Sequence, residues 1–458
     1  MNAKLTIFTL AFVAPILLAQ DFSNEDLAKR MIERRAVEAV IWGMSAVNYD
    51  LMLQEMLTKT KGQVNQFIYW SRPADWKNQT LTPNPDAIYF MTFFNTKDVG
   101  PVVIEVPPAN GGSFAANIDD VWQAALEDAG PEGADKGKGG KYLILPPGYK
   151  EKPPEGYIAL PSETYGGFAL FRSNLAGRIE ADVAKSIAYA KRLKIYPLAR
   201  AANPPPTIFT DVMEVLYDST IPFDLRFFQS LDRIVQSEPW IERDRAMIDQ
   251  LRSIGIEKGK TFNPDSKMQS ILNAAAGEAH DLLEQRYESA IPSYFEGTHW
   301  RAPAQPEAVE GQSTRYAKRD RYATDARGLT YTYGFIGIKR LGTAQFYLMA
   351  IKDKAGKNFD GGKTYRLTVP ANAPVEEYWS ATAYDRATHA LIRDMPRASA
   401  ASNSADVRKN ADGSIDVYLG PKAPAGKESN WIPTKAEHEF EVLFRLYRPQ
   451  KPLFDKTW

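Results

Sequence analysis

Four segments near the C-terminus alternate apolar and polar residues, and this alternation predicts strands. Successive side chains of a strand point to opposite faces, so each segment can bury one face and expose the other. The apolar positions are Tyr365, Leu367 and Val369, then Trp379, Ala381 and Ala383, then Ile415, Val417 and Leu419, and finally Phe440, Val442, Phe444 and Leu446. We therefore expect residues 301–458 to form an antiparallel β-sandwich or jelly-roll-like domain.

Residues 81–173 show the same period of two. In "VVIEV", Val102, Ile104 and Val106 alternate, and Pro107-Pro108 ends the segment. "KYLILPPGY" and "GGFALFRS" have the composition of further strands. The sequence thus predicts a second antiparallel β domain over residues 21–175.

Helical spacing appears before and between these β segments. The stretch 23–44 begins with Ser23 and acidic residues, which is typical of a capped helix. Between residues 176 and 300, Ile179, Val183 and Ile187 recur at a spacing of four. The expected fold class is mainly β with α: two antiparallel sandwich-like domains joined by a helical bridge.

Residues 1–20 have the pattern of a secretory signal peptide. Lys4 precedes an apolar run from Leu5 to Leu18, and the small residue Ala19 follows. The run is short for a membrane span, and an uncleaved anchor is the alternative. We expect export to the periplasm or the medium, with no stable membrane insertion once the signal is removed.

Charge and cysteine content narrow the possible partners. The 458 residues contain 56 Lys and Arg and 56 Asp and Glu, a balance that argues against nucleic acid as a partner. There are no cysteines and only four histidines, which removes thiolate chemistry and makes a metal site improbable. No standard catalytic or nucleotide-binding motif is present, so we expect no cofactor. The sequence leaves the oligomeric state open.

Longer motifs carry a family resemblance. They are "TPNPDAIY", "IDDVWQ" and "FALFRSN" in the first half, and "DGGKTYRLTVPANAPVEEYWSATAYD" and "FRLYRPQKPLFDKTW" in the second. Over residues 37–458 the chain resembles a bacterial two-domain family that pairs the domains of unknown function numbered 1254 and 1214. The resemblance implies two mainly-β domains with a helical insertion, and members that are often exported. It implies little about chemistry.

The turn Asn84-Pro85-Asp86 before an aromatic strand is a candidate site. Its carboxylate and amide, together with the phenol of Tyr89, suit the rim of a pocket, and we expect Asp86 and Tyr89 to be catalytic and Asn84 to bind the ligand. The alternative is a plain turn at the start of a strand, because Asn and Asp commonly bond their own backbone.

Asp119 is the second carboxylate candidate, a general base beneath the aromatic wall of Trp122. Core packing is the alternative for Trp122. If Asp86 and Asp119 share a cleft, burial and mutual repulsion should raise the pKa of at least one of them.

Tyrosines and arginines on the predicted strands supply further candidates. Tyr333 and Tyr384 are expected on outward strand faces, where phenols can line a ligand groove or simply pack across strands. Arg172, Arg366 and Arg445 stand among apolar neighbours, where an arginine pairs with a protein carboxylate or recognises one on a ligand. Of these, Arg172 is assigned to ligand binding.

These expectations combine into one functional hypothesis. The chain is expected to be an exported, cofactor-independent enzyme that acts on a small polar or aromatic molecule in a cleft between two β domains. The alternative is a non-catalytic envelope protein that binds a carbohydrate or another ligand.

Overall fold

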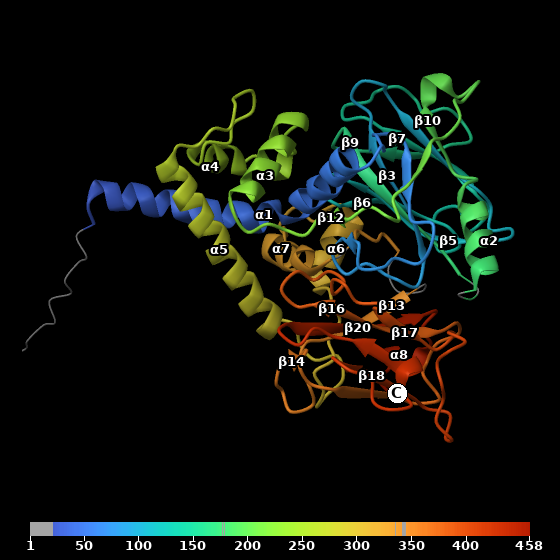
Figure 1. Ribbon diagram of the computed structural model, residues 1–458. Coiled ribbons are helices and arrows are strands. Elements are labelled where there is room, and N and C mark those ends of the chain that lie inside the picture. The colour runs from blue at the N-terminus through green and yellow to red at the C-terminus, as the bar shows by residue number, and fades with distance from the viewer. Residues whose placement is uncertain (1–21, 176, 178, 335, 341–344) are drawn as a thin grey trace, which may run out of the picture.

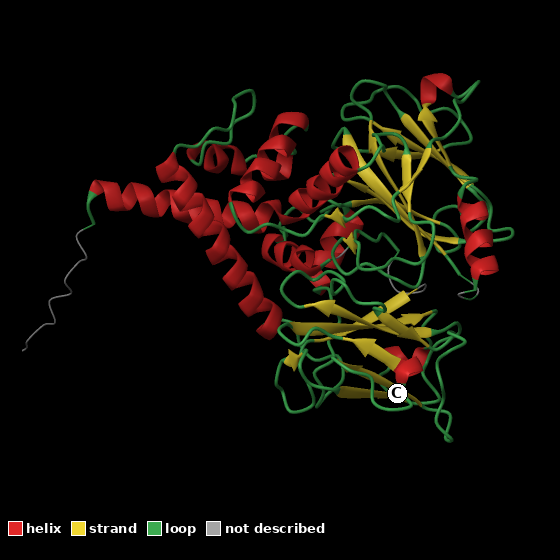
Figure 2. Ribbon diagram, viewed as in Figure 1, coloured by secondary structure: helices red, strands yellow, loops and turns green. Residues whose placement is uncertain are grey.

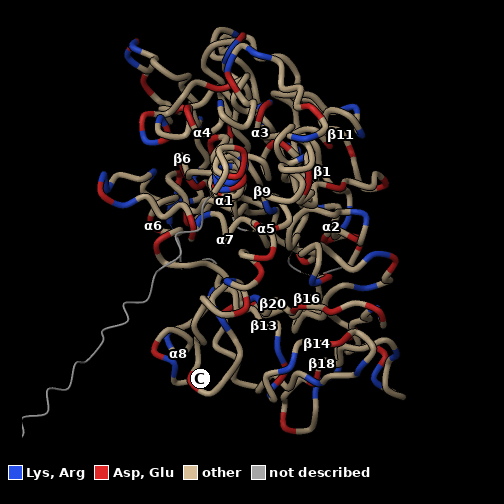
Figure 3. Tube along the Cα trace, turned by 90° about the vertical axis from the view of Figure 1, so that its left-hand side faces the viewer, with Lys and Arg blue, Asp and Glu red and all other residues tan. Residues whose placement is uncertain are grey.

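The computed structural model describes residues 22–175, 177, 179–334, 336–340 and 345–458. The expected signal segment lies outside the described residues. Two β bodies, one from the N-terminal strands and one from the C-terminal strands, lie beside a set of long helices (Figures 1 and 2). Acidic and basic residues are interspersed along the chain (Figure 3). None of the helices within the described ranges has the length and apolar character needed to cross a membrane.

The N-terminal body is a sandwich of two sheets. The larger sheet has the order β11-β1-β3-β9-β5-β6, and the smaller has the order β10-β4-β7-β8. Their strands are β1 (Phe67–Tyr69), β3 (Ile88–Asn95), β4 (Val102–Val106), β5 (Phe114–Asp120), β6 (Ala125–Ala129), β7 (Gly140–Leu145), β8 (Ile158–Pro161), β9 (Gly166–Ser173), β10 (Lys194–Pro197) and β11 (Phe209–Asp211). The short pair β2 (Asn78–Gln79) and β12 (Tyr217–Asp218) and the helix α2 (Glu180–Ala190) flank them. Most pairs are antiparallel; β1–β11, β7–β8 and the short pair β2–β12 are parallel.

The register of β3 and β9 assigns their side chains to two faces. Phe90 pairs with Phe171, and both belong to the buried core between the two sheets. Tyr89 pairs with Arg172 in the next register position. Because strand neighbours alternate in direction, Tyr89 and Arg172 project from the other face of the large sheet, away from the sandwich core.

The C-terminal body is also a sandwich. Its first sheet has the order β13-β20-β16-β17, with β14 pairing with β20, and its second has the order β15-β18-β19. The strands are β13 (Gln345–Ala350), β14 (Phe359–Asp360), β15 (Tyr365–Val369), β16 (Trp379–Asp385), β17 (Ser399–Ala401), β18 (Ile415–Gly420), β19 (Trp431–Pro433) and β20 (Glu439–Tyr447). The short helix α8 (Lys451–Phe454) follows.

The apolar positions predicted from alternation form the core of this second sandwich. Trp379, Val417 and Phe444 are all buried in it, as are their alternating neighbours on the same strands. The expected fold class, two mainly antiparallel sandwich domains with a helical segment, is confirmed. The opposite face of β16 and β20, expected to be wet, is instead buried: Tyr384 contacts Pro83 and Glu441 contacts Tyr287 of the helical segment, and both are 0 % exposed.

The helices form a layer against the second face of the large N-terminal sheet. They are α1 (Asn24–Lys59), α3 (Leu225–Ser237), α4 (Met247–Ser253), α5 (Ser266–Ser289), α6 (Pro306–Thr314) and α7 (Thr324–Tyr333). Ser23 and Asp26 form a capping box at the start of α1, as the sequence predicted. The helix extends beyond Met44 because Met52 and Met56 continue its buried face.

The prediction that Tyr333 lies on a strand is wrong. The segment "LTYTYG" alternates like a strand, yet it forms the last turns of α7. A Cβ at Gly328 would lie 2.6 Å from the backbone oxygen of Ile41, so this glycine lets α7 approach α1 closely. Tertiary packing against α1 thus overrides the local β propensity.

Candidate functional site

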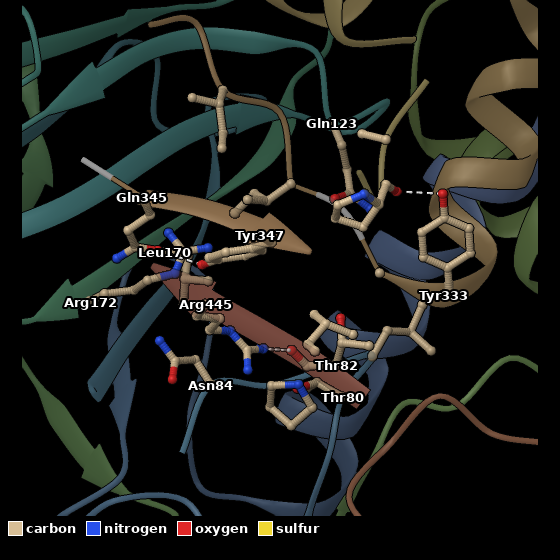
Figure 4. Close-up of a pocket in the computed structure, with 18 of the residues that line it drawn as sticks. Thr80, Thr82, Asn84, Gln123, Leu170, Arg172, Tyr333, Gln345, Tyr347 and Arg445 are labelled. Atoms are coloured by element: carbon tan, nitrogen blue, oxygen red, sulfur yellow. Dashed lines mark hydrogen bonds between the residues drawn. The ribbon is translucent and has the colours of Figure 1, made fainter. Parts of the chain in front are cut away.

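A cavity of about 230 Å³ lies where the two sandwiches and the helical layer meet. We call it the interdomain pocket. Its lining comes from the loop at residues 80–84, from β3 and β9, from residues 302–304, from the end of α7, and from β13 and β20 (Figure 4). Segments more than 360 residues apart in the sequence, such as the loop containing Thr82 and the strand containing Arg445, therefore share one wall.

Most of the pocket wall is apolar. The apolar lining residues are Met52, Leu81, Pro83, Met91, Phe168, Leu170, Ala302, Pro303, Ala304, Val309, Ile336, Ile338, Phe346 and Leu443. The two charged groups lie on one side: Figure 4 shows Arg172 and Arg445 there with Tyr347 and Asn84, whereas other polar groups, such as Tyr333 and Gln123, lie elsewhere on the wall. Such a wall suits a molecule with an apolar body and a polar end.

Arg445 is the most deeply buried charged group of this pocket, at 1 % exposure. It projects from β20 and donates hydrogen bonds to the hydroxyl oxygen of Thr382 (3.0 Å), the backbone oxygen of Thr82 (3.0 Å) and the phenol oxygen of Tyr384 (2.6 Å). Its Nε–H is buried and has no acceptor in the described structure. All the partners of Arg445 are therefore neutral.

Arg172 enters from the opposite domain. It is half-buried, and its Nη1 donates to the amide oxygen of Asn117 at 2.8 Å. Its guanidinium carbon lies 6.0 Å from the ring centre of Tyr89. The Nε–H of Arg172 is also buried and lacks an acceptor within the described residues.

The Asn84-Pro85-Asp86 turn forms hydrogen bonds between the two domains beside these arginines. The backbone N–H of Asn84 donates to the Tyr89 hydroxyl at 2.8 Å, and its side-chain amide donates to Tyr447 of β20 at 2.7 Å. Asn84 and Tyr89 line the pocket. Asp86 does not; it is 3 % exposed and accepts a hydrogen bond from Ser399 of β17 at 2.8 Å.

Asp119 lies behind the pocket wall and is not part of the lining. It is 0 % exposed, and neither of its oxygens accepts a hydrogen bond within the described structure. Burial raises the pKa of Asp119 well above its usual range, repulsion from Asp128 and Asp120 raises it further, and Arg172 opposes the shift. The carboxylates that repel Asp119 are therefore its neighbours on the same sheet, not Asp86.

The remaining sequence candidates divide between pocket and core. Tyr333 lines the pocket and donates its hydroxyl to the backbone oxygen of Pro303. Tyr384 is behind the wall, where it donates to Pro83 at 2.6 Å and accepts from Arg445. Trp122 packs in the helical core, with its ring centre 4.5 Å from that of Trp42.

Sequence reasoning assigned Arg172 to the site and named Arg445 only as a further candidate, whereas Tyr347 and Leu170 were not assigned to it. The signal for Arg445 was present in "FEVLFRLY", because this arginine occupies the non-core face of a strand whose other face is apolar. No local pattern indicated that another domain covers that face.

No group of three or more His, Asp or Glu side chains suited to a metal ion occurs in the described part of the chain. A search of curated proteins found no match. In a comparison with solved structures, the VPA0106 protein from Vibrio parahaemolyticus is 16 % identical, with a TM-score of 0.58 over 92 % of this chain and 96 % of that one. An uncharacterized protein from Burkholderia cenocepacia, 11 % identical over 93 % of each chain, has a TM-score of 0.41. The likeness to the Vibrio protein supports the fold alone.

Two family models match the chain, and both are described as proteins of unknown function. Residues 64–197, which include most of the N-terminal sandwich, match the DUF1254 model. Residues 344–451, which contain the strands of the C-terminal sandwich, match the DUF1214 model. The order and extent of the two matches agree with the resemblance seen in the sequence motifs. The chain therefore belongs to the two-domain family in which a DUF1254 domain precedes a DUF1214 domain.

Proposed function

We propose that this chain is an exported protein that binds a small, largely apolar molecule in the interdomain pocket. The observation that carries the proposal is the pocket itself, which combines a largely apolar wall with a polar cluster of Arg172, Arg445, Tyr347 and Asn84 on one side. Ligand sites favour such clefts between domains, where a few placed polar groups orient a mostly apolar ligand. The polar cluster draws on both sandwiches, so binding also depends on how the two domains pack.

The size of the pocket favours a small molecule over a polymer. Small-molecule pockets commonly enclose about 300–1,000 Å³, and this one lies just below that range. A carbohydrate chain would need many hydrogen-bonding groups along its length, whereas most of this wall cannot form hydrogen bonds. Binding of a compact ligand therefore fits better than binding of a polysaccharide.

A cofactor-independent acid–base enzyme is the second candidate, and the raised pKa of Asp119 favours it. A buried carboxyl group with a raised pKa can serve as a general acid. Asp119 lies against Gly337, whose neighbours Ile336 and Ile338 line the pocket. Substitution of Asp119 by asparagine should then abolish turnover of a bound molecule and leave its affinity nearly unchanged.

Filling the pocket tests the binding proposal. Leu170→Trp adds a large ring to the pocket wall, whereas Ile208→Trp adds the same ring at an exposed position. Fragment-sized compounds that raise the melting temperature of the wild-type protein should lose their effect with the first variant and keep it with the second. If both variants respond like the wild type, the compounds bind elsewhere and the proposal fails.

Export has a separate test. The charged and then apolar start of the chain motivates it. N-terminal sequencing of protein from cell fractions should find a mature chain that begins near Gln20 or Asp21 outside the cytoplasm. Soluble cytoplasmic protein that retains Met1 would contradict export.

A further inference from the structure

We infer that the ligand of the interdomain pocket carries a carboxylate, held between Arg172 and Arg445. The inference rests on the proposed function, because it specifies which class of small molecule the same pocket takes. It comes from the charge balance of the pocket wall, from the unused hydrogen-bond donors of the two arginines, and from a contrast with other buried arginines of the chain.

The charge balance of the pocket is one-sided. Arg172 and Arg445 are the charged residues among its described lining, which contains no Asp, Glu, Lys or His. An arginine keeps its positive charge at any ordinary pH. Two cations therefore line one largely apolar space, and the carboxyl group of Asp119, which interacts with Arg172, lies behind the wall rather than in it. Burying unpaired charge is costly, so an anionic ligand would relieve a penalty that the empty pocket carries.

Both guanidinium groups retain donors. The Nε–H groups of Arg172 and Arg445 are buried and have no acceptor in the described structure. A carboxylate has two oxygens, so it can accept one charge-assisted hydrogen bond from the Nε–H of each arginine. The two arginines come from different sandwiches, so a shared carboxylate would bridge β9 and β20 across the domain boundary.

Other buried arginines show what a structural role looks like in this protein. Arg386 lies 2.5 Å from the carboxylate of Glu284. Arg327, which is 0 % exposed, donates at 2.7 Å to the hydroxyl of Tyr322, which contacts the carboxylate of Asp244. In the described contacts, Arg445 has no direct carboxylate partner, and none of the hydroxyl groups it donates to contacts a carboxylate. Arg301, which is also buried, likewise donates only to a backbone oxygen among these contacts, that of Tyr287. What sets Arg445 apart is that it combines the missing carboxylate with a place in the pocket wall.

The rest of the wall specifies the body of the ligand. Leu170 and Leu443 each lie two residues before one of the arginines on the same strand and so share its face, and Met91, Ile336 and Phe346 extend the apolar surface. A compact hydrocarbon or aromatic group suits this surface. The inferred class is thus a small monocarboxylate with an apolar body, for which 3-phenylpropionate is a simple probe.

Calorimetric titration of the full chain tests the inference with three probes that share one body: 3-phenylpropionate, 3-phenylpropanamide and phenethyl phosphate. We expect the wild-type protein to bind the carboxylate at least about tenfold more tightly than the amide, as loss of a charge-assisted pair predicts. Arg172→Met and Arg445→Met should each weaken carboxylate binding by about tenfold or more and change amide binding less than about twofold. Arg366→Met, at an exposed arginine of β15, is the matched control and should change neither.

The outcomes separate the inference from the proposed function. Equal binding of amide and carboxylate would overturn the carboxylate inference while the pocket remains a binding site. Tighter binding of the phosphate than of the carboxylate would overturn it as well. Binding that persists unchanged in Leu170→Trp would overturn both, and so would failure of all three probes to bind. If Arg445→Met does not fold, Arg172→Met and the charge-preserving Arg445→Lys decide the question, since the lysine should keep part of the carboxylate preference that the methionine loses.

Discussion

Substitution of His389 by asparagine should destabilise the protein in a pH-dependent way. His389 is 4 % exposed, and its ring lies between two carboxylates, 2.9 Å from Glu441 and 3.5 Å from Glu284. Arg386 pairs with Glu284, and Tyr287 donates to Glu441 at 2.5 Å. The network joins α5 to the C-terminal sheet. It also supports the pocket loop, because the backbone oxygen of His389 accepts a hydrogen bond from Thr82 at 2.6 Å.

The size of the effect follows from the pKa of His389. Burial opposes its charge, but Glu441 and Glu284 outweigh burial and raise the pKa from 6.5 to about 9. That shift corresponds to about 3 kcal/mol of preference for the charged form in the folded state. Because the pKa of His389 is higher in the folded protein, its charge stabilises the fold fully at pH values below the unfolded pKa of 6.5. This stabilisation is lost as the pH rises through about 9. Asparagine removes the charge and tolerates the positive φ of 54° at this position.

Urea unfolding followed by tryptophan fluorescence provides the assay. At about pH 6, His389→Asn should lower the free energy of unfolding by about 3 kcal/mol relative to wild type, and near pH 10 the difference should largely vanish. His299→Asn, a half-buried histidine outside this network, is the control and should show little change at either pH. A loss of the same size at both pH values would mean that packing, not charge, explains it. A loss below about 1 kcal/mol at pH 6 would refute the stabilising role of the network.

Two further substitutions test other parts of the structure. Trp379 is 3 % exposed in the core of the C-terminal sandwich. Trp379→Ala should lower the free energy of unfolding by about 3–5 kcal/mol. Wild-type stability of this variant would contradict the assigned strand face. Asp119→Asn should raise the urea midpoint of unfolding at pH 7, because the raised pKa of this buried carboxyl group makes its ionisation unfavourable to folding. Near pH 3 the substitution should have almost no effect, because the acid is then protonated in both the folded and the unfolded state. A lower midpoint at pH 7 would show instead that the charged form of Asp119 stabilises the fold.

The cores of the sandwiches were predictable from the sequence because each strand buries one apolar face. The alternation in "YWSATAYD" and "FEVLFRLY" placed Trp379 and Phe444 correctly. The capping box of α1 was equally local and equally visible. Features that depend on residues within a few positions of each other leave a pattern that a single segment can display.

The candidate site was predictable only in part because its walls come from distant segments. Asn84, Tyr89 and Arg172, which the sequence singled out, line the same pocket because a turn and two paired strands hold them together. Arg445 lay on a face that looked solvated, and it is buried because the loop at residues 80–86 covers that face. The proposal that Asp86 and Asp119 act together gains no support from their positions, because Asp86 contacts β17 and Asp119 lies beneath the sheet surface near Asp128.

A crystal structure of the protein with 3-phenylpropionate bound would test the assignment of the interdomain pocket most directly. The pocket geometry predicts the carboxylate within hydrogen-bond distance, about 2.7–3.0 Å, of both Arg172 and Arg445, with the phenyl ring against Leu170 and Leu443. A probe that lies outside the pocket, or one whose ring faces the two arginines while its carboxylate points to solvent, would contradict it.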